Sequence, residues 1–534
     1  MRLATPLSVC LAVLAMLSYP LLPQAAKKAS ESSEGKSKSS EESNSIDSVE
    51  AAEDCGPGPE VDDEKCPPIW KLNAERLVES EVEAAAFKAG ATPAVMANCK
   101  KNMKFVRQKL AAKHGLPIPD DEKASSICVD DTVVTDDQAA AWAEELNGGK
   151  PLHPHDNRGR RKKREFTIHN SWLWPNGVVY YQFDSSLSAS YRTVVQQAIN
   201  AYQAQTCLSF VNAAIQPYLS IQGSSNGCWS YIGRVINVQP LNLGSGCGTI
   251  GVAMHELMHA IGVYHEQSRP DRDSHIAIQW GNIISQYVGN FYSCGGSCRN
   301  PQTPYDFASV MQYGPGAVSS NGNPTILAHN SVNTKSLGWR GPATFWDIRQ
   351  INLVYCPSHC GGGNGQCKNN GYPNPRNCAV CVCPEGYGGA DCGSRYNVNG
   401  CGAELTATAN WQTTGVPNNA WLANTVCVWW INSPKGTQVQ WQITRLRTWY
   451  NVLTSGTQYC GVQYLEMRYS TDLTAVGERF CGTSGTNVRT SATNRIIAIL
   501  HDPNDQYAPL WYMGFDISFR YGKRVTYLLF THCA

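Results

Sequence analysis

One stretch of this 534-residue chain decides how its fold is interpreted, and it reads His255-Glu256-Leu257-Met258-His259-Ala260-Ile261-Gly262-Val263-Tyr264-His265. Two histidines four residues apart project from one face of a helix, about one turn apart. Two neutral imidazoles at that spacing can bind one Zn2+. Gly262 permits the left-handed backbone that ends a helix, so the chain can turn and bring His265 to the same ion. Three protein ligands leave one position for water, which is typical of a catalytic zinc site.

Glu256 lies next to the first of these histidines. At that position a carboxylate can reach metal-bound water without itself becoming a ligand. A pair of histidines at this spacing, taken alone, is often an ordinary surface or core pair. The adjacent glutamate, the glycine and the third histidine together favour a catalytic zinc site.

Length and composition limit the remaining possibilities. The chain is long enough for several domains, and its 42% hydrophobic and 16% charged residues exclude a wholly disordered protein. The 44 Lys and Arg residues balance 43 Asp and Glu residues, for a net charge of +1. No overall basic field is therefore available to hold nucleic acid.

Cysteine usage and the first residues indicate a secreted protein. The 22 cysteines, crowded into the second half of the chain, favour an oxidising compartment. Residues 1–26 have the order of a secretory signal: a charged start, an apolar run and then small residues. A membrane anchor is the alternative, but the run is short for a bilayer span and contains Pro20. No later apolar run is long enough to cross a membrane.

Residues 27–164 are predicted to form a pro-segment. The segment begins with a Ser-, Glu- and Lys-rich stretch that cannot fold alone, and it ends in the basic run Arg161-Lys162-Lys163-Arg164. Such a run can be a solvated linker or a patch that binds polyanions. In a secreted chain, exposed basic clusters are also sites for a secretory convertase, so we expect cleavage between Arg164 and Glu165.

Three regions follow the pro-segment. Residues 165–357 combine strand-like runs, such as 178–181, with helix-like runs, such as 191–202, and predict a mixed α and β domain. Residues 358–393 are rich in Gly and Cys and too short for a core of their own, so disulfides must hold them. Residues 401–521 alternate aromatic and β-branched side chains, which predicts a β-sandwich, and 522–534 form a tail.

The stretch from His255 to Asp273 resembles the signature of astacin-type metzincin proteases. Downstream, Ser309-Val310-Met311-Gln312-Tyr313-Gly314 resembles their Met-turn, in which Met311 would form an apolar floor beneath the zinc ligands. The resemblance also implies that Tyr313 is a switchable extra ligand. Read without the family, both residues would be ordinary core side chains. The family usually has His in place of Gln312, but not as a ligand.

The resemblance covers about 190 residues, from Glu165 to Cys356. It places the mature N-terminus at Glu165, the position that the basic run indicates independently. It also implies that the new ammonium is buried beside Glu266, which follows the third histidine. Burying two opposite charges is favourable only when they are paired, so cleavage would be linked to ordering of the site.

The family's mechanism implies a role for each residue. Zinc-bound water would attack the peptide carbonyl, with Glu256 as the general base that passes the proton to the leaving amine. Tyr313 would leave the metal and stabilise the oxyanion. The expected reaction is endopeptide hydrolysis with one catalytic Zn2+.

The accessory regions resemble an EGF-like module at 358–393 and a CUB domain at 401–521. The expected fold class is thus multidomain: an α+β astacin-type catalytic domain, a small disulfide-rich module and an all-β sandwich. Cys294 and Cys298 most simply form a local bridge, with a second metal site as the alternative. The expected disulfides are Cys207–Cys356, Cys228–Cys247, Cys294–Cys298, Cys360–Cys378, Cys367–Cys381, Cys383–Cys392, Cys401–Cys427 and Cys460–Cys481. Cys533 remains, either free or joined to another chain.

Latency has a weaker signal in the sequence. Astacin pro-segments often block zinc with an Asp in a Phe-x-Gly-Asp motif, which this chain lacks. Asp131 falls where that aspartate would be. Cys128 could bind zinc as a thiolate instead, or pair with Cys99.

The sequence therefore predicts a secreted zinc metalloendopeptidase made as a zymogen. Tolloid-like and nematode-type astacins of this architecture often process collagens or other matrix and cuticle proteins, so extracellular proteins are the expected substrates. The alternative is a catalytically silent protein that uses its CUB and EGF modules for adhesion. Retention of Glu256 and of all three histidines argues against that alternative.

Overall fold

The computed structural model describes residues 128–129, 132–133, 167 and 170–523, with short gaps. The gaps are 225–226, 295–297, 299–302, 363–364, 398–399, 421–424, 449–450, 454, 462, 484 and 503–512. The predicted signal, most of the pro-segment, the tail with Cys533, and the predicted site residues Asp131, Arg164 and Glu165 lie outside the described residues.

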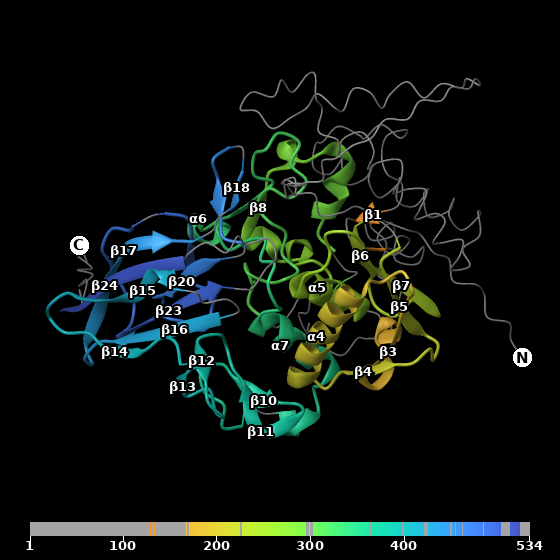
Figure 1. Ribbon diagram of the computed structural model, residues 1–534, viewed down its shortest axis with the longest axis horizontal. Coiled ribbons are helices and arrows are strands. Elements are labelled where there is room, and N and C mark those ends of the chain that lie inside the picture. Colours follow the sequence, from red (N-terminus) through yellow and green to blue (C-terminus); the bar gives the residue numbers. More distant parts are fainter. Residues whose placement is uncertain are drawn as a thin grey trace, which may run out of the picture.

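The first half of the catalytic region is built on a seven-stranded sheet of order β1-β2-β6-β7-β5-β3-β4 (Figure 1). Its strands are β1 (Cys128–Val129), β2 (Thr132–Val133), β3 (Val178–Phe183), β4 (Ser209–Asn212), β5 (Tyr218–Gln222), β6 (Cys228–Tyr231) and β7 (Val238–Leu243). Strands β7, β5, β3 and β4 run parallel, and β6 is antiparallel to β7. Strands β1 and β2, which lie in the predicted pro-segment, add to the sheet at β6, with Thr132 opposite Ser230.

Two helices, α4 (Ala189–Gln205) and α5 (Ile250–Ala260), share the core with this sheet. Helix α4 begins where the Ser188 side chain accepts a hydrogen bond from the Tyr191 N–H, as an N-cap does. Its buried residues, Val195, Ala198, Ile199 and Tyr202, follow the helical period and form one apolar face. Tyr202 Oη donates to the Met254 carbonyl at 2.8 Å and so joins α4 to α5.

The second half of the catalytic region is mostly irregular. It contains the small sheet β8 (Ile276–Ile278) and β9 (Ile326–Ala328), then α6 (Ser331–Thr334) and α7 (Phe345–Tyr355). Helix α7 begins with a capping box, in which the side chains of Thr344 and Asp347 each accept the other's backbone N–H. Short 3-10 helices are Asn170–Trp172, Pro175–Gly177, Glu266–Ser268, Arg272–Ser274, Trp280–Asn282, Ser285–Phe291 and His359–Gly362.

The cysteine-rich segment 358–393 forms two small hairpins held by three disulfides. The strands are β10 (Tyr372–Asn374), β11 (Asn377–Val382) and β12 (Tyr387–Gly388), the last paired with β13 (Ser394–Arg395). Arg376 of this segment donates from Nε to the Gln203 and Thr206 carbonyls, at 3.0 and 2.9 Å. A cation at the C-terminal end of α4 is favoured by the helix dipole, so this contact ties the segment to the catalytic region.

Residues 401–523 form two packed sheets, as the alternating sequence predicts. One sheet has the order β14-β16-β23-β20-β21 and the other β15-β24-β17-β22. The strands are β14 (Glu404–Thr406), β15 (Gln412–Ala420), β16 (Thr425–Asn432), β17 (Thr437–Arg447), β20 (Tyr464–Arg468), β21 (Glu478–Phe480), β22 (Arg489–Thr490), β23 (Arg495–Asp502) and β24 (Met513–Lys523). A separate hairpin consists of β18 (Asn451–Val452) and β19 (Gln458–Tyr459).

Strand β23 explains an unbroken apolar run in the sequence, Ile496-Ile497-Ala498-Ile499-Leu500. Its even-numbered residues lie in the core between the two sheets. Its odd-numbered residues pack on the outer face against Tyr387 and Cys392 of the cysteine-rich segment. Both faces of this strand are therefore buried, which removes the alternation expected of a strand with one wet face.

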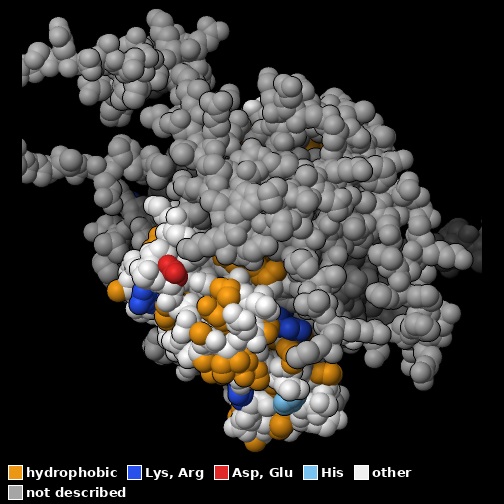
Figure 2. All heavy atoms as spheres, turned by 90° about the vertical axis from the view of Figure 1, so that its right-hand side faces the viewer, with side chains coloured by type: hydrophobic (Ala, Val, Ile, Leu, Met, Phe, Trp, Pro, Cys, Tyr) orange, Lys and Arg blue, Asp and Glu red, His pale blue; other side chains and the backbone are white. Residues whose placement is uncertain are grey.

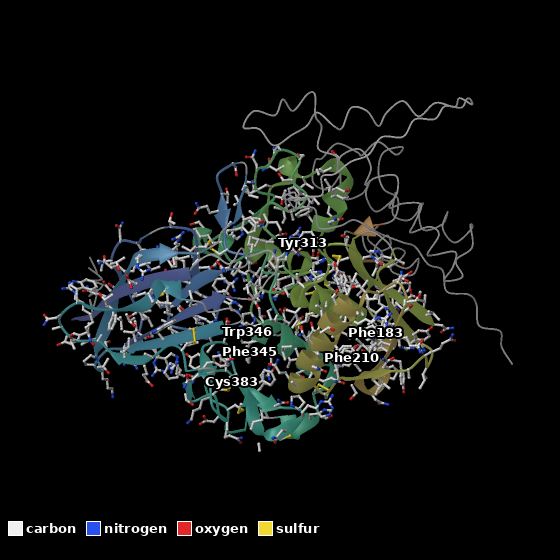
Figure 3. All side chains as sticks on the ribbon, viewed as in Figure 1. Phe183, Phe210, Tyr313, Phe345, Trp346 and Cys383 are labelled. Carbon is white, nitrogen blue, oxygen red and sulfur yellow. A yellow bond between two sulfur atoms is a disulfide. The ribbon has the colours of Figure 1, made fainter. Side chains whose placement is uncertain are left out.

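The sandwich also packs directly on the catalytic region. Trp339, 3% exposed, forms a small core with Cys460, Tyr464 and Cys481. A cavity of about 610 Å3 lies where the three regions meet, and Phe345, Trp346 and Cys383, labelled in Figure 3, are among its lining residues. On the described part of the face in Figure 2, charged side chains stand singly among hydrophobic and uncharged polar ones. Within the described residues no helix has the length and apolarity needed to cross a bilayer.

Candidate metal centre

Helix α5 carries the first two histidines, and its ends are well defined. It begins at Thr249, whose side chain accepts the Val252 N–H. Gly262 follows the helix with φ of +104°, a conformation that strongly favours glycine. The Gly262 N–H donates to the His259 carbonyl and the Val263 N–H to the Met258 carbonyl, which is the Schellman pattern. The chain reverses there, as the sequence predicts, and returns His265 to the helix.

The three histidines meet at one point. Their Nε2 atoms lie 3.0, 3.2 and 3.3 Å apart, and all three side chains are buried. Nitrogens bound to one tetrahedral Zn2+ at about 2.0–2.1 Å would stand about 3.3 Å from one another. The triangle of nitrogens therefore fits a single zinc ion.

Two backbone carbonyls fix which imidazole nitrogens face the metal. His255 Nδ1 lies 2.7 Å from the Val310 carbonyl, and His259 Nδ1 lies 2.8 Å from the Val263 carbonyl. A carbonyl only accepts hydrogen bonds, so each Nδ1 must carry the proton. Each Nε2 is then left with its lone pair directed at the common point, as a zinc ligand requires.

A buried aspartate that sequence reasoning missed binds the backbone N–H of Val310. Asp347 Oδ2 accepts the Val310 N–H at 3.0 Å, and Asp347 Oδ1 accepts Ser309 Oγ at 2.6 Å. The carboxylate thus positions the loop whose next group, the Val310 carbonyl, orients His255. The spacing of Thr344 and Asp347 is that of a capping box, which could have revealed a helix start but not this second task.

The segment predicted as the Met-turn contacts two of the histidines, through the Val310 carbonyl and the Tyr313 ring. Met311 is fully buried, and its carbonyl accepts the Glu266 N–H at 3.0 Å. Tyr313 follows, with its ring centroid 4.7 Å from that of His265. The Tyr313 hydroxyl is buried and has no hydrogen-bond partner among the residues that the structure describes. Figure 3 labels Tyr313 near the middle of the molecule.

Glu256 and Glu266 lie in different surroundings. Glu256 is 0% exposed on α5, beside the first ligand. Glu266 Oε1 accepts both Arg269 Nη1, at 2.9 Å, and the Asp306 N–H, at 2.7 Å. Glu266 therefore already has one cationic partner, Arg269, which the sequence analysis did not single out. The Thr167 N–H donates to the Gly262 carbonyl, which places the chain two residues after Glu165 close to the zinc-ligand loop.

Asp306 adds a second buried carboxyl group that the sequence did not reveal. Its Oδ2 accepts Thr344 Oγ1 at 2.6 Å, and its Oδ1 accepts the Ala308 N–H at 3.0 Å. Burial, and then the neighbouring Asp347 carboxylate, raise the pKa of Asp306 to about 7. Burial likewise raises the pKa of Asp347 above its ordinary value.

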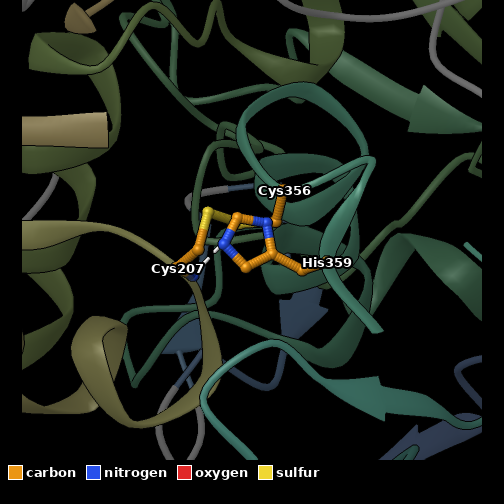
Figure 4. Close-up of side chains that lie close together, drawn as sticks. All are labelled: Cys207, Cys356 and His359. Atoms are coloured by element: carbon orange, nitrogen blue, oxygen red, sulfur yellow. Dashed lines mark hydrogen bonds between the residues drawn. A yellow bond between two sulfur atoms is a disulfide. The ribbon is translucent and has the colours of Figure 1, made fainter. Parts of the chain in front are cut away.

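A second group of metal-type ligands has another explanation. Cys207, Cys356 and His359 lie together in Figure 4, but the two cysteines form a disulfide. Oxidised sulfurs cannot act as thiolate ligands, so this group is a covalent link between the start of β4 and the end of α7. The structure contains the pairs expected from the sequence, Cys207–Cys356, Cys228–Cys247, Cys294–Cys298, Cys360–Cys378, Cys367–Cys381, Cys383–Cys392, Cys401–Cys427 and Cys460–Cys481.

Comparison with known proteins agrees with this geometry. Residues 166–356 match the family model of Astacin (Peptidase family M12A), and residues 401–519 match that of the CUB domain. Residues 166–356 form an astacin peptidase domain. Astacins use one catalytic zinc ion, and the three histidines of this domain form a group that could hold it. Neither of these two matches covers the cysteine-rich segment, so its EGF-like assignment has no support from a family model here.

Two relatives and one solved structure illustrate the similarity. Zinc metalloproteinase nas-31 of Caenorhabditis elegans is 35% identical over 381 residues, 69% of this chain and 60% of that protein. Zinc metalloproteinase nas-34 of the same organism is 32% identical over 409 residues, 73% and 63% of the two chains. The hatching enzyme zinc-protease of Oryzias latipes is 34% identical over 35% of this chain and 94% of its own, with a TM-score of 0.32. The chain thus spans under two thirds of these nematode relatives.

Proposed function

We propose that the chain is a secreted zinc endopeptidase, made as a zymogen and activated by cleavage after Arg164. The observation that carries the proposal is the convergence of three buried imidazoles on one point, with the buried Glu256 on the same helix as the first two. Bound zinc would supply water of lowered pKa and polarise the scissile carbonyl. The eight disulfides fit the oxidising compartment that secretion implies.

Two side chains would perform the proton and charge transfers. Glu256 would accept a proton from the attacking water and deliver it to the leaving amine. Its complete burial keeps bulk water from competing in that transfer. The Tyr313 hydroxyl, packed against the ring of His265, would donate a hydrogen bond to the oxyanion as negative charge develops.

Activation would act through the N-terminus. The hydrogen bond between Thr167 and Gly262 brings the chain near the zinc loop, and two residues span at most about 7 Å. We infer that the ammonium of Glu165 is buried near Glu266. The neighbouring carboxyl groups of Asp306 and Asp347 support this, because Arg269 alone does not balance them.

Latency would come from the pro-segment. Strand β2 extends the catalytic sheet at β6, so this part of the pro-segment is docked on the catalytic domain. We propose that Asp131, between β1 and β2 in the sequence, blocks the zinc, with Cys128 as the alternative ligand. The two choices can be separated by measuring the activity of the uncleaved Asp131→Ala and Cys128→Ser chains. The variant that lacks the blocking residue should be active before cleavage.

Residues 358–393 are proposed as an EGF-like module because their three disulfides join first to third, second to fourth and fifth to sixth cysteine. The CUB domain would dock protein substrates. Extracellular matrix, collagen or cuticle precursors are the substrate class suggested by the architecture. Cys533 could join a second chain.

The test is hydrolysis of a broad peptide library by the processed full chain and by Glu256→Gln. The variant keeps the size of the side chain but cannot act as a base, so we expect the same zinc content and a loss of turnover of about 10^2- to 10^4-fold. Equal turnover would contradict the mechanism. An inactive native protein that still binds zinc would favour the silent adhesion protein instead.

The activation step has its own test. Arg164→Ala should leave a larger, inactive product in the medium, because the convertase site is destroyed. Lys162→Ala, within the same basic run but not at the bond, is the matched control and should be processed. A product of mature size from Arg164→Ala would contradict cleavage at this bond.

A further inference from the structure

The segment that follows Tyr313 lies against the CUB domain. Figure 1 shows the β18 hairpin, in blue, reaching from the CUB sheets toward the green part of the catalytic domain that holds β8 and α6. The turn of this hairpin is closed by a hydrogen bond from the Leu453 N–H to the Thr457 carbonyl at 2.9 Å. Residues more than 130 positions apart in the sequence therefore meet beside the candidate catalytic tyrosine.

Gly316 leaves room for the hairpin, and Gly314 lies in contact distance of it. A Cβ added at Gly316 would overlap the methyl groups of Leu453. A Cβ added at Gly314, directly after Tyr313, would lie 4.0 Å from the Tyr459 ring. Gly338, with φ of +77°, packs directly against Gly314, because a Cβ added at Gly338 would lie 2.6 Å from Gly314 Cα. The backbone after Tyr313 is thus enclosed by the CUB hairpin and by Gly338.

Backbone hydrogen bonds hold the hairpin in place on the catalytic domain. The Cys460 N–H donates to the Lys335 carbonyl at 2.8 Å, and the Arg340 N–H donates to the Gly461 carbonyl at 3.3 Å. Between these two bonds, Trp339 packs against Tyr464, with ring centroids 5.4 Å apart. Two backbone hydrogen bonds and the buried Trp339 side chain thus hold the hairpin and the catalytic domain together.

The same segment is held on its other side by the catalytic domain. The Pro315 carbonyl accepts the Thr325 N–H at 2.7 Å and the Ile326 N–H at 3.2 Å, both at the start of β9. Gln267 Oε1 accepts the Tyr313 N–H at 3.1 Å. The Tyr313 hydroxyl has no such anchor within the described part of the chain. Its position is therefore set by the packing of the ring against His265 and Phe291 and by the backbone, which is clamped between β9 and the CUB hairpin.

We propose that the CUB domain positions Tyr313 for the reaction, with Leu453 and Tyr459 as positioning residues that act through Gly316 and Gly314. The inference rests on the oxyanion role of Tyr313 in the proposed function. It makes the CUB domain part of the catalytic unit, in addition to any role in docking substrates. The CUB contact would limit how far the segment after Tyr313 can move, and so where the hydroxyl lies when charge develops.

The experiment uses the processed full chain and a short peptide that is too small to reach the CUB surface. Leu453→Ala should lower kcat about three- to tenfold with KM unchanged, because it loosens the clamp without touching the peptide. Leu453→Met, which keeps the volume, should restore kcat. Leu405→Ala, a leucine that is also half-buried but packs within the CUB core, is the matched control and should leave kcat unchanged.

A double-mutant cycle with Tyr313→Phe decides whether the effect passes through the tyrosine. The inference expects Leu453→Ala to lower kcat in the native background and to have no further effect on Tyr313→Phe. An equal fall in both backgrounds, or none in the native one, would overturn it. Gly316→Ala, which displaces Leu453 from the opposite side, should reproduce the native-background result if Leu453→Ala is poorly secreted.

The same cycle separates this inference from the proposed function. If Tyr313→Phe impairs catalysis and Leu453→Ala does not, the inference alone fails. If Tyr313→Phe has native kcat while Glu256→Gln is inactive, the oxyanion role of Tyr313 fails and the inference fails with it. Zinc content measured on each variant shows that the metal site itself is intact.

Discussion

The astacin domain and its joint with the CUB domain each bury a cluster of charged side chains, and the two clusters are balanced differently. The zinc-side cluster contains Glu266, Asp306 and Asp347 with one guanidinium, that of Arg269. Arg269 is shared further with the half-buried Asp271, at 2.9 Å. Among the described residues of this cluster, carboxyl groups outnumber guanidinium groups.

The joint cluster contains two carboxylates and two guanidiniums. Glu466, 0% exposed, accepts Arg468 Nε at 2.7 Å and Arg479 Nε at 3.1 Å. Glu385 of the cysteine-rich segment lies 3.4 Å from Arg468. Burial alone would raise the pKa of Glu466, but the two guanidiniums hold it below its ordinary value.

The difference indicates what each cluster is for. The joint cluster pairs two carboxylates with two guanidiniums and links the cysteine-rich segment to the CUB domain, which is a structural role. In the zinc-side cluster, among the described residues, three carboxyl groups share one guanidinium, and burial, followed by the neighbouring Asp347, raises the pKa of Asp306. In the proposed function, an ammonium at Glu165 would add a positive charge to this cluster after cleavage, and this would link processing to the site.

Removing a negative charge should therefore change the stability of the folded chain in opposite directions in the two clusters. The larger change is expected at the joint. Glu466→Gln leaves two buried guanidiniums without their shared carboxylate, and we expect a loss of about 3–5 kcal/mol in the free energy of unfolding. The matched control is Glu404→Gln, an exposed carboxylate 3.9 Å from Arg495, with an expected change within about 0.5 kcal/mol. Denaturant unfolding of both variants measures this, and equal losses would contradict the comparison.

In the zinc-side cluster the effect should depend on pH. The pKa of Asp306 is about 7 in the folded chain and about 3.8 as its ordinary value, so the folded state holds the proton more tightly. That stabilisation is complete below about pH 4 and is lost as the pH rises through about 7. Asp306→Asn should therefore reduce the loss of thermal stability of the uncleaved chain between pH 5 and pH 8. An unchanged pH dependence would show that Asp306 does not titrate there.

Processing should act in the same direction, with a smaller effect. If the ammonium of Glu165 lies in the zinc-side cluster, it offsets the excess carboxylate charge at neutral pH. The processed chain should then lose less thermal stability between pH 5 and pH 8 than the uncleaved Arg164→Ala chain. Identical pH profiles of the melting temperature would place the new N-terminus elsewhere.

The smallest effect is expected at the contact between Arg376 and the end of α4. Arg376→Ala removes donors to exposed backbone carbonyls, so we expect a loss of about 1 kcal/mol in unfolding free energy and unchanged kcat. Lys368→Ala, whose amine pairs with Asp391 within the same segment, is the control for a loss of positive charge. A large fall in kcat for Arg376→Ala would mean that this segment reaches the catalytic site.

The sequence predicted what depends on local spacing. The helix that carries His255 and His259, the turn at Gly262 and the alternation of the CUB strands each follow from residues close together in the chain. Family resemblance added the roles of Met311 and Tyr313, which spacing alone does not indicate.

What the sequence did not predict depends on residues far apart. Asp347 orients His255 through Val310 from more than 90 positions away, and a capping-box pattern carries no sign of that contact. The packing of Trp339 on the CUB domain likewise joins elements with no shared local pattern. Strand β23 was expected, but the burial of both its faces depends on the cysteine-rich segment that covers it.

The most direct test of the account is the zinc content of the purified, processed chain compared with that of His259→Ala. We expect one zinc per native chain, and a large loss of zinc from the variant without loss of the folded CUB domain. Elemental analysis together with circular dichroism measures both. A native chain without zinc, or a His259→Ala chain that keeps it, would contradict the claim that these three imidazoles form a catalytic metal site.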